Sequence, residues 1–170
     1  MVRRMLDVSQ LQAIDPLRGG NHFDICESMR RVLISMEKKI TDRHLDVDAD
    51  IPEEPILVLG DNDMITQVLY NLLENATKFA REGSTLYLGV AMIDGKARVT
   101  VQNLGDTIPA EELPLLFERF HKSDKSRSED KDGVGLGLYI VKTILEQHRE
   151  KISVTSEDGV TTFTFSLATE

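Results

Sequence analysis

Residues Ile65–Phe79 read ITQVLYNLLENATKF, and this stretch decides the fold of the chain. Its apolar residues recur three, four, seven and eight positions apart, which is the spacing of an amphipathic helix that packs one face on a sheet. Asp61 or Asp63 can cap the start of such a helix, and Gly83 stands just past its end. We therefore expect a central helix here, with its apolar face made by Ile65, Val68, Leu69, Leu72, Leu73, Ala76 and Phe79.

Three polar residues share one stripe of this expected helix. Asn71, Asn75 and Lys78 are spaced four and three positions apart, so they lie on the same side, next to the apolar face. An amide oxygen can coordinate a hard cation such as Mg²⁺, and a lysine can contact phosphate oxygens as a compact charge. The stripe fits either a nucleotide site or a solvated outer face, and this helix alone does not decide between them.

The composition is that of an ordinary globular chain with an acidic surface. Its 170 residues, 41% hydrophobic and 29% charged, suffice for a sizeable core. The net charge of −9 argues against a nucleic-acid partner. No apolar run approaches the roughly 18 residues of a membrane span, and the first residues lack a signal-peptide apolar block. With the single Cys26 unable to form an internal disulfide, we expect a cytoplasmic chain, and a longer parent with a membrane anchor is compatible with this.

The N-terminal residues differ in organisation from the rest. Residues 1–14 have helical apolar spacing that ends at Asp15-Pro16 and Gly19-Gly20. A short helix of this kind is marginal alone, so it resembles the cut end of a longer helix. We therefore expect residues 1–20 to form a separate arm and residues 21–170 to form one domain.

The domain is expected to mix helices and strands. Before the central helix, Phe23 and Asp24 are predicted to open a helix that runs through residues 25–40. Alternation predicts strands elsewhere, and Asp-Gly pairs predict two hairpin turns. The remaining expected elements are strands at His44–Asp50, Ile56–Leu59, Leu86–Ala91 and Ala97–Asn103, a short helix or helical turn at Ala110–Phe120, a helix after Gly137, and a hairpin of Lys151–Ser156 with Thr161–Leu167.

Two loops have the residues of a ligand site. The segment GVGLG at 133–137 precedes a helix, where glycine backbone N–H groups and the helix N-terminus favour an anion such as phosphate. A dinucleotide-binding fold would need a strand directly before it, whereas residues 121–132 have no apolar residue and predict a mobile surface loop. NLGDTIP, at 103–109, ends a strand with an amide beside Gly105 and an apolar wall at Ile108. Such a segment could bind a flat heterocycle with one hydrogen-bonding side chain and one aliphatic side chain. On this segment alone, an ordinary exit from a strand into a loop is the simpler interpretation.

The order of these motifs is more specific than any one of them. NLLENATKF looks like the asparagine box, NLGDTIP the first glycine box, LFERFHKSDKSRS the phenylalanine box, GVGLGLYIVK the second glycine box and EDGVTTFTF the closing hairpin. Over Phe23–Leu167 the chain thus resembles the catalytic and ATP-binding domain of sensor histidine kinases, within the group that also holds gyrase-type, chaperone-type and mismatch-repair ATPases. MLDVSQL is similar to the tail of the second helix of the dimerisation and phosphoacceptor domain.

The resemblance implies a two-layer α/β (α+β) sandwich. A mixed, mostly antiparallel sheet would be covered on one face by about three helices, with ATP between the central helix and a mobile lid. Carried over by position, Asn75 would coordinate Mg²⁺, Asn71 would support the metal and phosphate end, and Lys78 would contact phosphate. The other implied contacts are backbone donors at Gly133, Gly135, Leu136 and Gly137, the adenine side at Asn103, Gly105 and Ile108, and a charge contact from Arg127 to the terminal phosphate during transfer.

The sequence departs from the family pattern in the first glycine box. The adenine-binding aspartate falls at Asn103, and the second glycine falls at Thr107. An asparagine can accept from an adenine amino group and can also donate, so we expect binding to survive with altered selectivity or affinity. A rival register makes Asp106 the adenine ligand; it ranks lower because Asn103 stands two residues before the glycine and five before Ile108-Pro109. The HGG often found after the last helix is His148-Arg149-Glu150 here.

A phosphoacceptor is not apparent in this sequence. None of His22, His44, His121 and His148 begins a helix like the His-Glu-x-x-x-Pro helix that receives phosphate in the family. We expect the chain to hold ATP without phosphorylating itself on histidine, and to act on an acceptor domain in the same full-length protein or in another chain, with a response regulator as an indirect partner. Two alternatives remain: a free-standing ATPase or serine-kinase relative, which generally lacks LFERF, and a non-catalytic nucleotide-sensing module.

Overall fold

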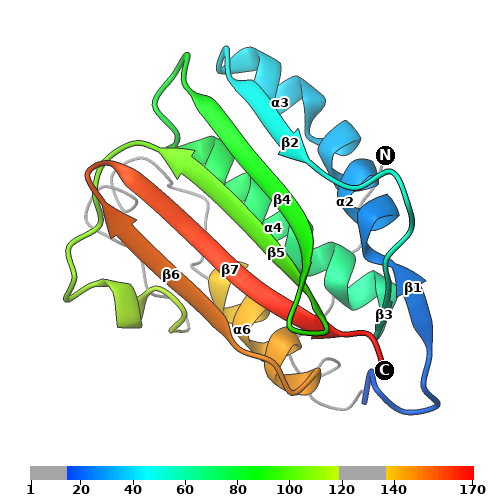
Figure 1. Cartoon of the computed structure of the whole chain (residues 1–170). Helices are drawn as coiled ribbons and strands as arrows, with labels where there is room; N and C mark the ends of the chain where they lie inside the picture. The colour runs from blue at the N-terminus through cyan, green and yellow to red at the C-terminus, as the bar shows by residue number, and fades with distance from the viewer. Residues whose placement is uncertain (1–14, 119–136) are drawn as a thin grey trace.

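The computed structural model describes residues 15–118 and 137–170, and its centre is a five-stranded sheet in the order β2-β4-β5-β7-β6 (Figure 1). β2 (Asp46–Asp50) pairs in parallel with β4 (Thr85–Ile93). The other neighbours are antiparallel. These are β5 (Lys96–Leu104), β7 (Val160–Ala168) and β6 (Ile152–Glu157). The sheet is therefore mixed and mostly antiparallel, as predicted.

Helices cover one face of this sheet. Figure 1 shows α4 (Asn62–Phe79) behind β4 and β5, and α4 packs against both α2 (Ile25–Ser35) and α6 (Gly137–Gln147). The short α3 (Glu37–Asp42) follows α2. In β5 and β7 alternate residues are buried, so each of these strands has one apolar face in the core, whereas all residues of the edge strand β2 are exposed. The predicted two-layer sandwich is confirmed, and its core includes Leu69, Leu72 and Leu73 of α4 with Leu88, Val99, Phe163 and Phe165 of the sheet.

The central helix forms where the apolar spacing predicts it, and it begins three residues earlier. Asp61 is the N-cap, and its carboxylate accepts from the Met64 N–H at 2.9 Å. This satisfies one of the backbone donors that a helix start leaves unpaired. The two predicted hairpin turns are also present, since Asp94-Gly95 and Asp158-Gly159 all have positive φ.

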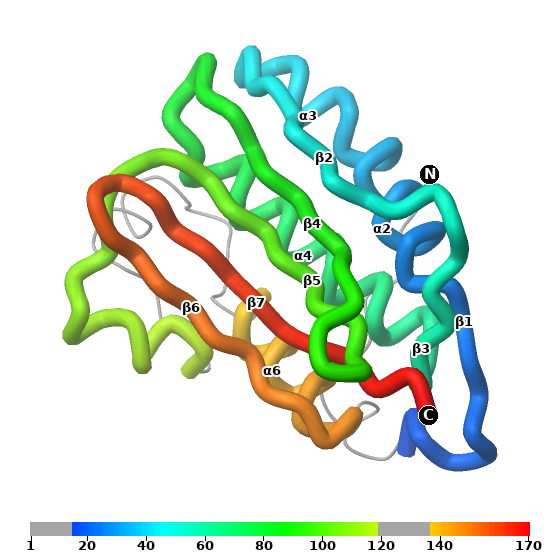
Figure 2. The backbone as a smooth tube through the Cα atoms, in the orientation of Figure 1, coloured from blue at the N-terminus to red at the C-terminus, as the bar shows by residue number. Residues whose placement is uncertain are grey.

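The first helix begins at Ile25, as predicted, but the residues before it form a strand that was not predicted. His22–Asp24 form strand β1, which pairs antiparallel with β3 (Leu57–Leu59) in a separate two-stranded sheet (Figure 2). Asp24 ends this strand as the N-cap of α2, because one carboxylate oxygen accepts from the N–H groups of both Cys26 and Ile56. Asp24 therefore opens the helix as its N-cap and is at the same time the last residue of β1.

Three further boundaries differ from the prediction. The helix expected over residues 25–40 is divided at Met36, a fully buried residue that ends α2 and precedes α3. β2 starts at Asp46 because His44 has a positive φ and lies in a turn. Within the described part of Ala110–Phe120, the only helical element is the 3₁₀ turn η1 (Leu113–Leu115), where Pro114 cannot donate to a longer helical ladder.

Residues 1–14, which hold the predicted helical arm, lie outside the described residues. Of that expected arm, Pro16–Gly19 are described and form a turn. Within the described ranges, no helix has the length and apolarity needed to cross a bilayer.

Candidate functional site

The end of β5 is joined to the C-terminal end of α4. The Arg81 N–H donates to the Leu104 carbonyl at 2.6 Å. Next along the chain, Gly105 packs so closely on the helix that a Cβ added to it would lie 2.5 Å from the Phe79 carbonyl oxygen. Only glycine fits at this contact without a backbone shift. The junction therefore brings the strand end that carries Asn103 against the last turns of the helix that carries Asn75.

Asn103 is nearly buried, with 4% of the residue exposed, and its amide makes no hydrogen bond to another residue within 15–118 and 137–170. The amide is not sealed from water, because Thr77 Oγ1 is the only fully buried side-chain polar atom without a partner in these ranges. An amide with free hydrogen-bonding capacity at a junction of two elements is suited to bind a ligand.

Two buried hydroxyls near Asn103 were missed by the sequence analysis. Thr161 faces Asn103 in the β5–β7 ladder, and its Oγ1 lies 2.8 Å from Ser156 Oγ. Both residues are buried. A signal was present, because Thr161 shares the buried face of β7 with Phe163 and Phe165 and is polar on an otherwise apolar face.

Asn71 uses both ends of its amide inside the protein. Gln67 Nε2 donates to Asn71 Oδ1 at 2.8 Å, and Asn71 Nδ2 donates to the Gly137 carbonyl at 3.1 Å. Gly137 is the first residue of α6 and the last glycine of GVGLG. Asn71 therefore holds the start of α6 against α4, a structural bond that the stripe pattern did not predict.

Asn75 and Lys78 lie one and two turns further along α4. Asn75 is partly buried, and its amide has no hydrogen bond within the described part of the chain. The Lys78 ammonium lies 5.4 Å from the centre of the Phe79 ring. Arg43 Nη1 donates to the carbonyls of Thr77 and Lys78, both at 2.7 Å, and so fixes the last turn. A cation at a helix C-terminus is also favoured by the helix dipole.

The phosphate side of the predicted site is only partly described. Gly137 begins α6, whose N-terminus carries the positive end of the helix dipole. Gly133, Gly135, Leu136, Arg127 and the expected lid at 121–132 lie outside the described residues. Ile108 is described, and its N–H donates to Ser156 Oγ at 2.8 Å.

The described residues contain no cluster of three or more His, Cys, Asp or Glu side chains that could hold a metal ion. Mg²⁺ in nucleotide sites is usually held by one or two protein oxygens together with phosphate oxygens, so a cage of carboxylates is not required. The unpartnered Asn75 amide offers one such oxygen. The donor set therefore fits a magnesium ion that arrives with a phosphate ligand.

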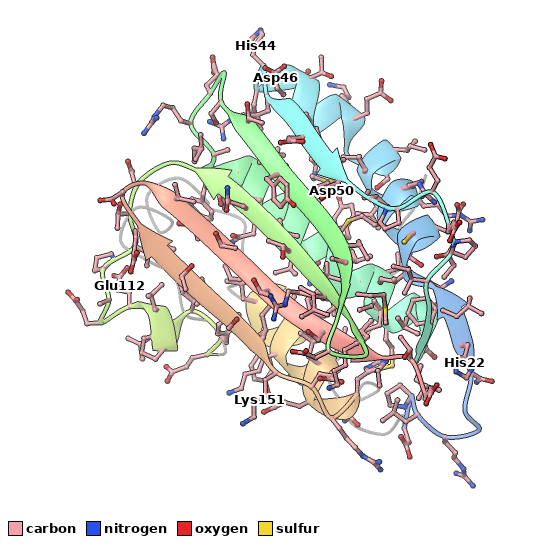
Figure 3. The ribbon with its side chains drawn as sticks, viewed as in Figure 1. His22, His44, Asp46, Asp50, Glu112 and Lys151 are labelled. Atoms are coloured by element: carbon pink, nitrogen blue, oxygen red, sulfur yellow. The ribbon has the colours of Figure 1, made fainter. Side chains whose placement is uncertain are left out.

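The described histidines lie in separate parts of the fold. Figure 3 shows His22 and His44 at two well-separated edges of the molecule. His148 is buried, its Nε2 accepts from the Asp61 N–H at 3.1 Å, and its Nδ1 lies 2.8 Å from the Ile144 carbonyl. Burial lowers the pKa of this ring below the usual 6.5, against the raising effects of the Ile144 carbonyl, Asp61 and Glu150. His148 is thus a neutral structural residue.

Comparison with known proteins identifies the class. Residues 60–170 match the family described as histidine kinase-, DNA gyrase B-, and HSP90-like ATPase, so the chain belongs to this family. It is 32% identical over 167 residues to the sensor histidine kinase CusS of Escherichia coli K12, and 30% identical over 172 residues to WalK of Bacillus subtilis. Each match covers 98% of this chain and only 34% and 28% of the relative, respectively. The chain therefore spans about a third of the length of these relatives.

Solved structures give the same result at the level of the fold. The catalytic domain of histidine kinase ThkA superposes with a TM-score of 0.78 at 26% identity, covering 88% of this chain and 95% of that domain. ThkA in complex with response regulator protein TrrA matches with a TM-score of 0.73 at 27% identity, covering 89% of this chain and 42% of that one. Within its family, the chain is the catalytic, ATP-binding domain of the sensor histidine kinase kind.

Proposed function

We propose that this chain binds Mg·ATP and transfers the terminal phosphate to a histidine on an acceptor domain outside the given sequence. The observation that carries the proposal is the amide of Asn103, nearly buried and without a hydrogen bond to the described residues, at the α4–β5 junction in a fold shared with histidine kinase catalytic domains. Such an amide can both accept and donate a hydrogen bond, so it can hold the polar edge of a flat base.

The base side of the proposed site is built from β5, the following loop and β7. Asn103 accepts from the exocyclic amino group of adenine, and Ile108 covers one face of the base. Gly105 allows the loop to approach the helix, as its contact with Phe79 indicates. Thr161 lies opposite Asn103 in the ladder, where its hydroxyl can support the same hydrogen-bond set.

The phosphate side of the proposed site is built from α4 and the start of α6. Asn75 would hold Mg²⁺ through its amide oxygen, and the ion would supply positive charge that neutralises the phosphates. Lys78 contacts phosphate, and Asn71 holds Gly137 so that the helix start faces the same space. The remaining assigned residues are Gly133, Gly135, Leu136 and Gly137 as backbone donors and Arg127 as the cation near the transferred group.

Phosphoryl transfer by such a site is mainly positioning and charge stabilisation. Amides, glycines and single cations supply both without a nucleophile of their own. Because the reacting nitrogen must come within about 3–3.5 Å of the phosphorus in line, the acceptor histidine has to be brought by a separate, dockable domain. In support, His22 lies in a strand, His44 in a turn and His148 in a buried contact, so none of these three is on a helix that could dock as an acceptor.

The proposal extends to the surroundings of the chain. Residues 1–20 are the tail of the acceptor-domain helix and its linker, and residues 21–170 are the catalytic domain. The acceptor domain belongs to the same full-length protein or to another chain, and a response regulator receives the phosphate afterwards. The ThkA complex with its response regulator supports this by similarity. The domain works in the cytoplasm, where ATP is available.

One experiment separates this proposal from its alternatives. The purified chain is mixed with labelled ATP and the isolated acceptor domain of its parent or of a similar kinase. Acid-labile, alkali-stable label on the acceptor supports the histidine kinase. Phosphate release without labelled protein indicates a free-standing ATPase, acid-stable and alkali-labile label indicates a serine kinase, and binding without either indicates a nucleotide-sensing module. Label on the chain alone that is lost in His121→Ala overturns the need for a separate acceptor.

A further inference from the structure

The loop after β5 is fastened to the turn between β6 and β7. The Gly105 N–H donates to the Gly159 carbonyl at 2.8 Å. In return the Gly159 N–H donates to Thr107 Oγ1 at 2.7 Å. A third hydrogen bond runs from the Ile108 N–H to Ser156 Oγ at 2.8 Å. Among these three, the bond to Thr107 is the one in which the loop contributes a side chain.

The same loop is held tightly between two other backbones. A Cβ added to Gly105 would lie 2.5 Å from the Phe79 carbonyl oxygen, and a Cβ added to Gly159 would lie 2.9 Å from the Gly105 carbonyl oxygen. Gly159 also has a φ of +79°, which suits glycine. The end of α4, the loop and the hairpin turn are therefore stacked in direct backbone contact, so the hairpin turn fixes where the loop lies relative to α4.

We propose that Thr107 is a positioning residue for nucleotide binding. Its hydroxyl clamps loop 105–108 to the Gly159 amide and thereby holds Asn103 and Ile108 in the arrangement that receives the base. This inference rests on the proposed function. A glycine at position 107 would lack the hydroxyl and would leave the free loop more conformational freedom. Thr107 thus orders the loop before the nucleotide binds, so less conformational entropy is lost on binding.

The test compares Thr107→Val, which keeps the shape and removes the acceptor, with Thr107→Ser, which keeps the hydroxyl. Thr162→Val is the matched control, because Thr162 Oγ1 donates to Gln102 Oε1 at 3.0 Å on the other face of the same hairpin. Affinities for ADP and Mg·ATP are measured by calorimetry, and exchange of the Gly159 amide is measured by NMR. Thr107 is exposed and Thr162 is only partly buried, so the variants at both positions are expected to fold.

Loss of one such hydrogen bond is expected to weaken ADP and Mg·ATP binding about threefold to tenfold in Thr107→Val. Gly159 amide exchange accelerates in this variant. Thr107→Ser stays within about twofold of the unmodified chain, and Thr162→Val keeps full affinity. Thr107→Gly is a second probe and should bind as weakly as Thr107→Val, or more weakly.

Equal affinity of Thr107→Val and the unmodified chain would overturn the positioning role and leave the proposed function standing. So would an equal loss of affinity in Thr162→Val, because it would indicate a general effect of hairpin stability. Failure of the unmodified chain to bind ADP or Mg·ATP would instead overturn the proposed function, and this inference with it.

Discussion

Asn71 and Gly137 are joined by a hydrogen bond, with 3.1 Å between Asn71 Nδ2 and the Gly137 carbonyl oxygen. The Asn71 oxygen accepts from Gln67 Nε2, so the whole amide is used. Asn71 is 6% exposed, and these bonds are therefore largely shielded from water. The beginning of α6 is held in place by the middle of α4, which couples the glycine-rich segment to the central helix.

Asn71→Ala should destabilise the fold and weaken nucleotide binding together. The change removes the bond to Gly137 and leaves the buried Gln67 amide unpaired, which costs about 1–3 kcal/mol. Urea unfolding measures the stability, and calorimetry measures Mg·ATP affinity. Gln67→Ala is the control, since it retains the bond between the helices. A loss of affinity in Gln67→Ala as large as in Asn71→Ala would contradict a specific role for the contact with Gly137.

Asn75→Ala should lose Mg²⁺-dependent ATP binding while the fold stays intact. Asn75 makes no hydrogen bond within the described residues, so its removal costs little stability. Removing this proposed metal ligand should weaken Mg·ATP binding by at least about tenfold, with a smaller effect on ATP in EDTA. Glu74→Ala is the neighbouring control: it removes a largely exposed ion pair with Lys39 and should leave affinity unchanged. Unchanged Mg·ATP affinity in folded Asn75→Ala would rule out the metal assignment.

Asn103→Asp should narrow the choice of base. An amide can accept from the 6-amino group of adenine or donate to the 6-oxo group of hypoxanthine, whereas a carboxylate only accepts. The unmodified chain should therefore bind ITP within about tenfold of ATP, and the preference for ATP should rise at least about tenfold in Asn103→Asp. Competition against a fluorescent ATP analogue measures both affinities. The same ATP to ITP ratio in the two proteins would argue that Asn103 does not contact the base.

His148 should make stability depend on pH. Its pKa in the folded chain is lowered below 6.5 by burial, so the unfolded chain takes up a proton first as the pH falls. The free energy of unfolding should be unaffected by this ring above about pH 7.5 and should decrease as the pH falls through 6.5 toward the folded pKa. Urea unfolding between pH 5 and pH 8 measures this, in about half-unit steps.

His148→Gln provides the comparison for that pH dependence. It keeps a neutral polar side chain where Nε2 accepts from the Asp61 N–H, but it does not titrate. The decrease in stability between about pH 7 and pH 5 should become smaller in this variant. If both proteins lost stability equally over that range, carboxylates and not His148 would be responsible.

The sequence could predict the elements whose signals are local. The apolar spacing of Ile65–Phe79 and the Asp-Gly turns depend on neighbours a few residues apart, and the structure has the central helix and both hairpins. Strand β1 could not be predicted in this way, because its partner β3 is more than thirty residues away. Asp24 shows both kinds of contact: its bond to the Cys26 N–H is local and agrees with a helix that starts at Ile25, whereas its bond to the Ile56 N–H joins distant segments.

The candidate site shows the same difference between local and long-range signals. Asn103 and Gly105 stood out by sequence, and the structure places them at the junction with α4. Three other contacts join segments more than fifty residues apart. They are the bond of Asn71 to Gly137, the pairing of Thr161 with Asn103 and the bond of the Gly159 N–H to Thr107. The spacing of residues within one helix or strand carries no information about such pairs. They can be seen only in the packed structure.

Whether Asn75 and Asn103 line one nucleotide site is tested most directly by NMR, with the chain labelled at asparagine side-chain nitrogens and titrated with Mg·ATP. Resonances are assigned from single-site variants, and Asn21, at the opposite end of α4, serves as the internal reference. The side-chain amide signals of Asn75 and Asn103 should shift together and saturate at the same ATP concentration while Asn21 stays unchanged. Saturation with Mg·ATP that leaves the Asn103 signal unmoved would contradict the proposed site.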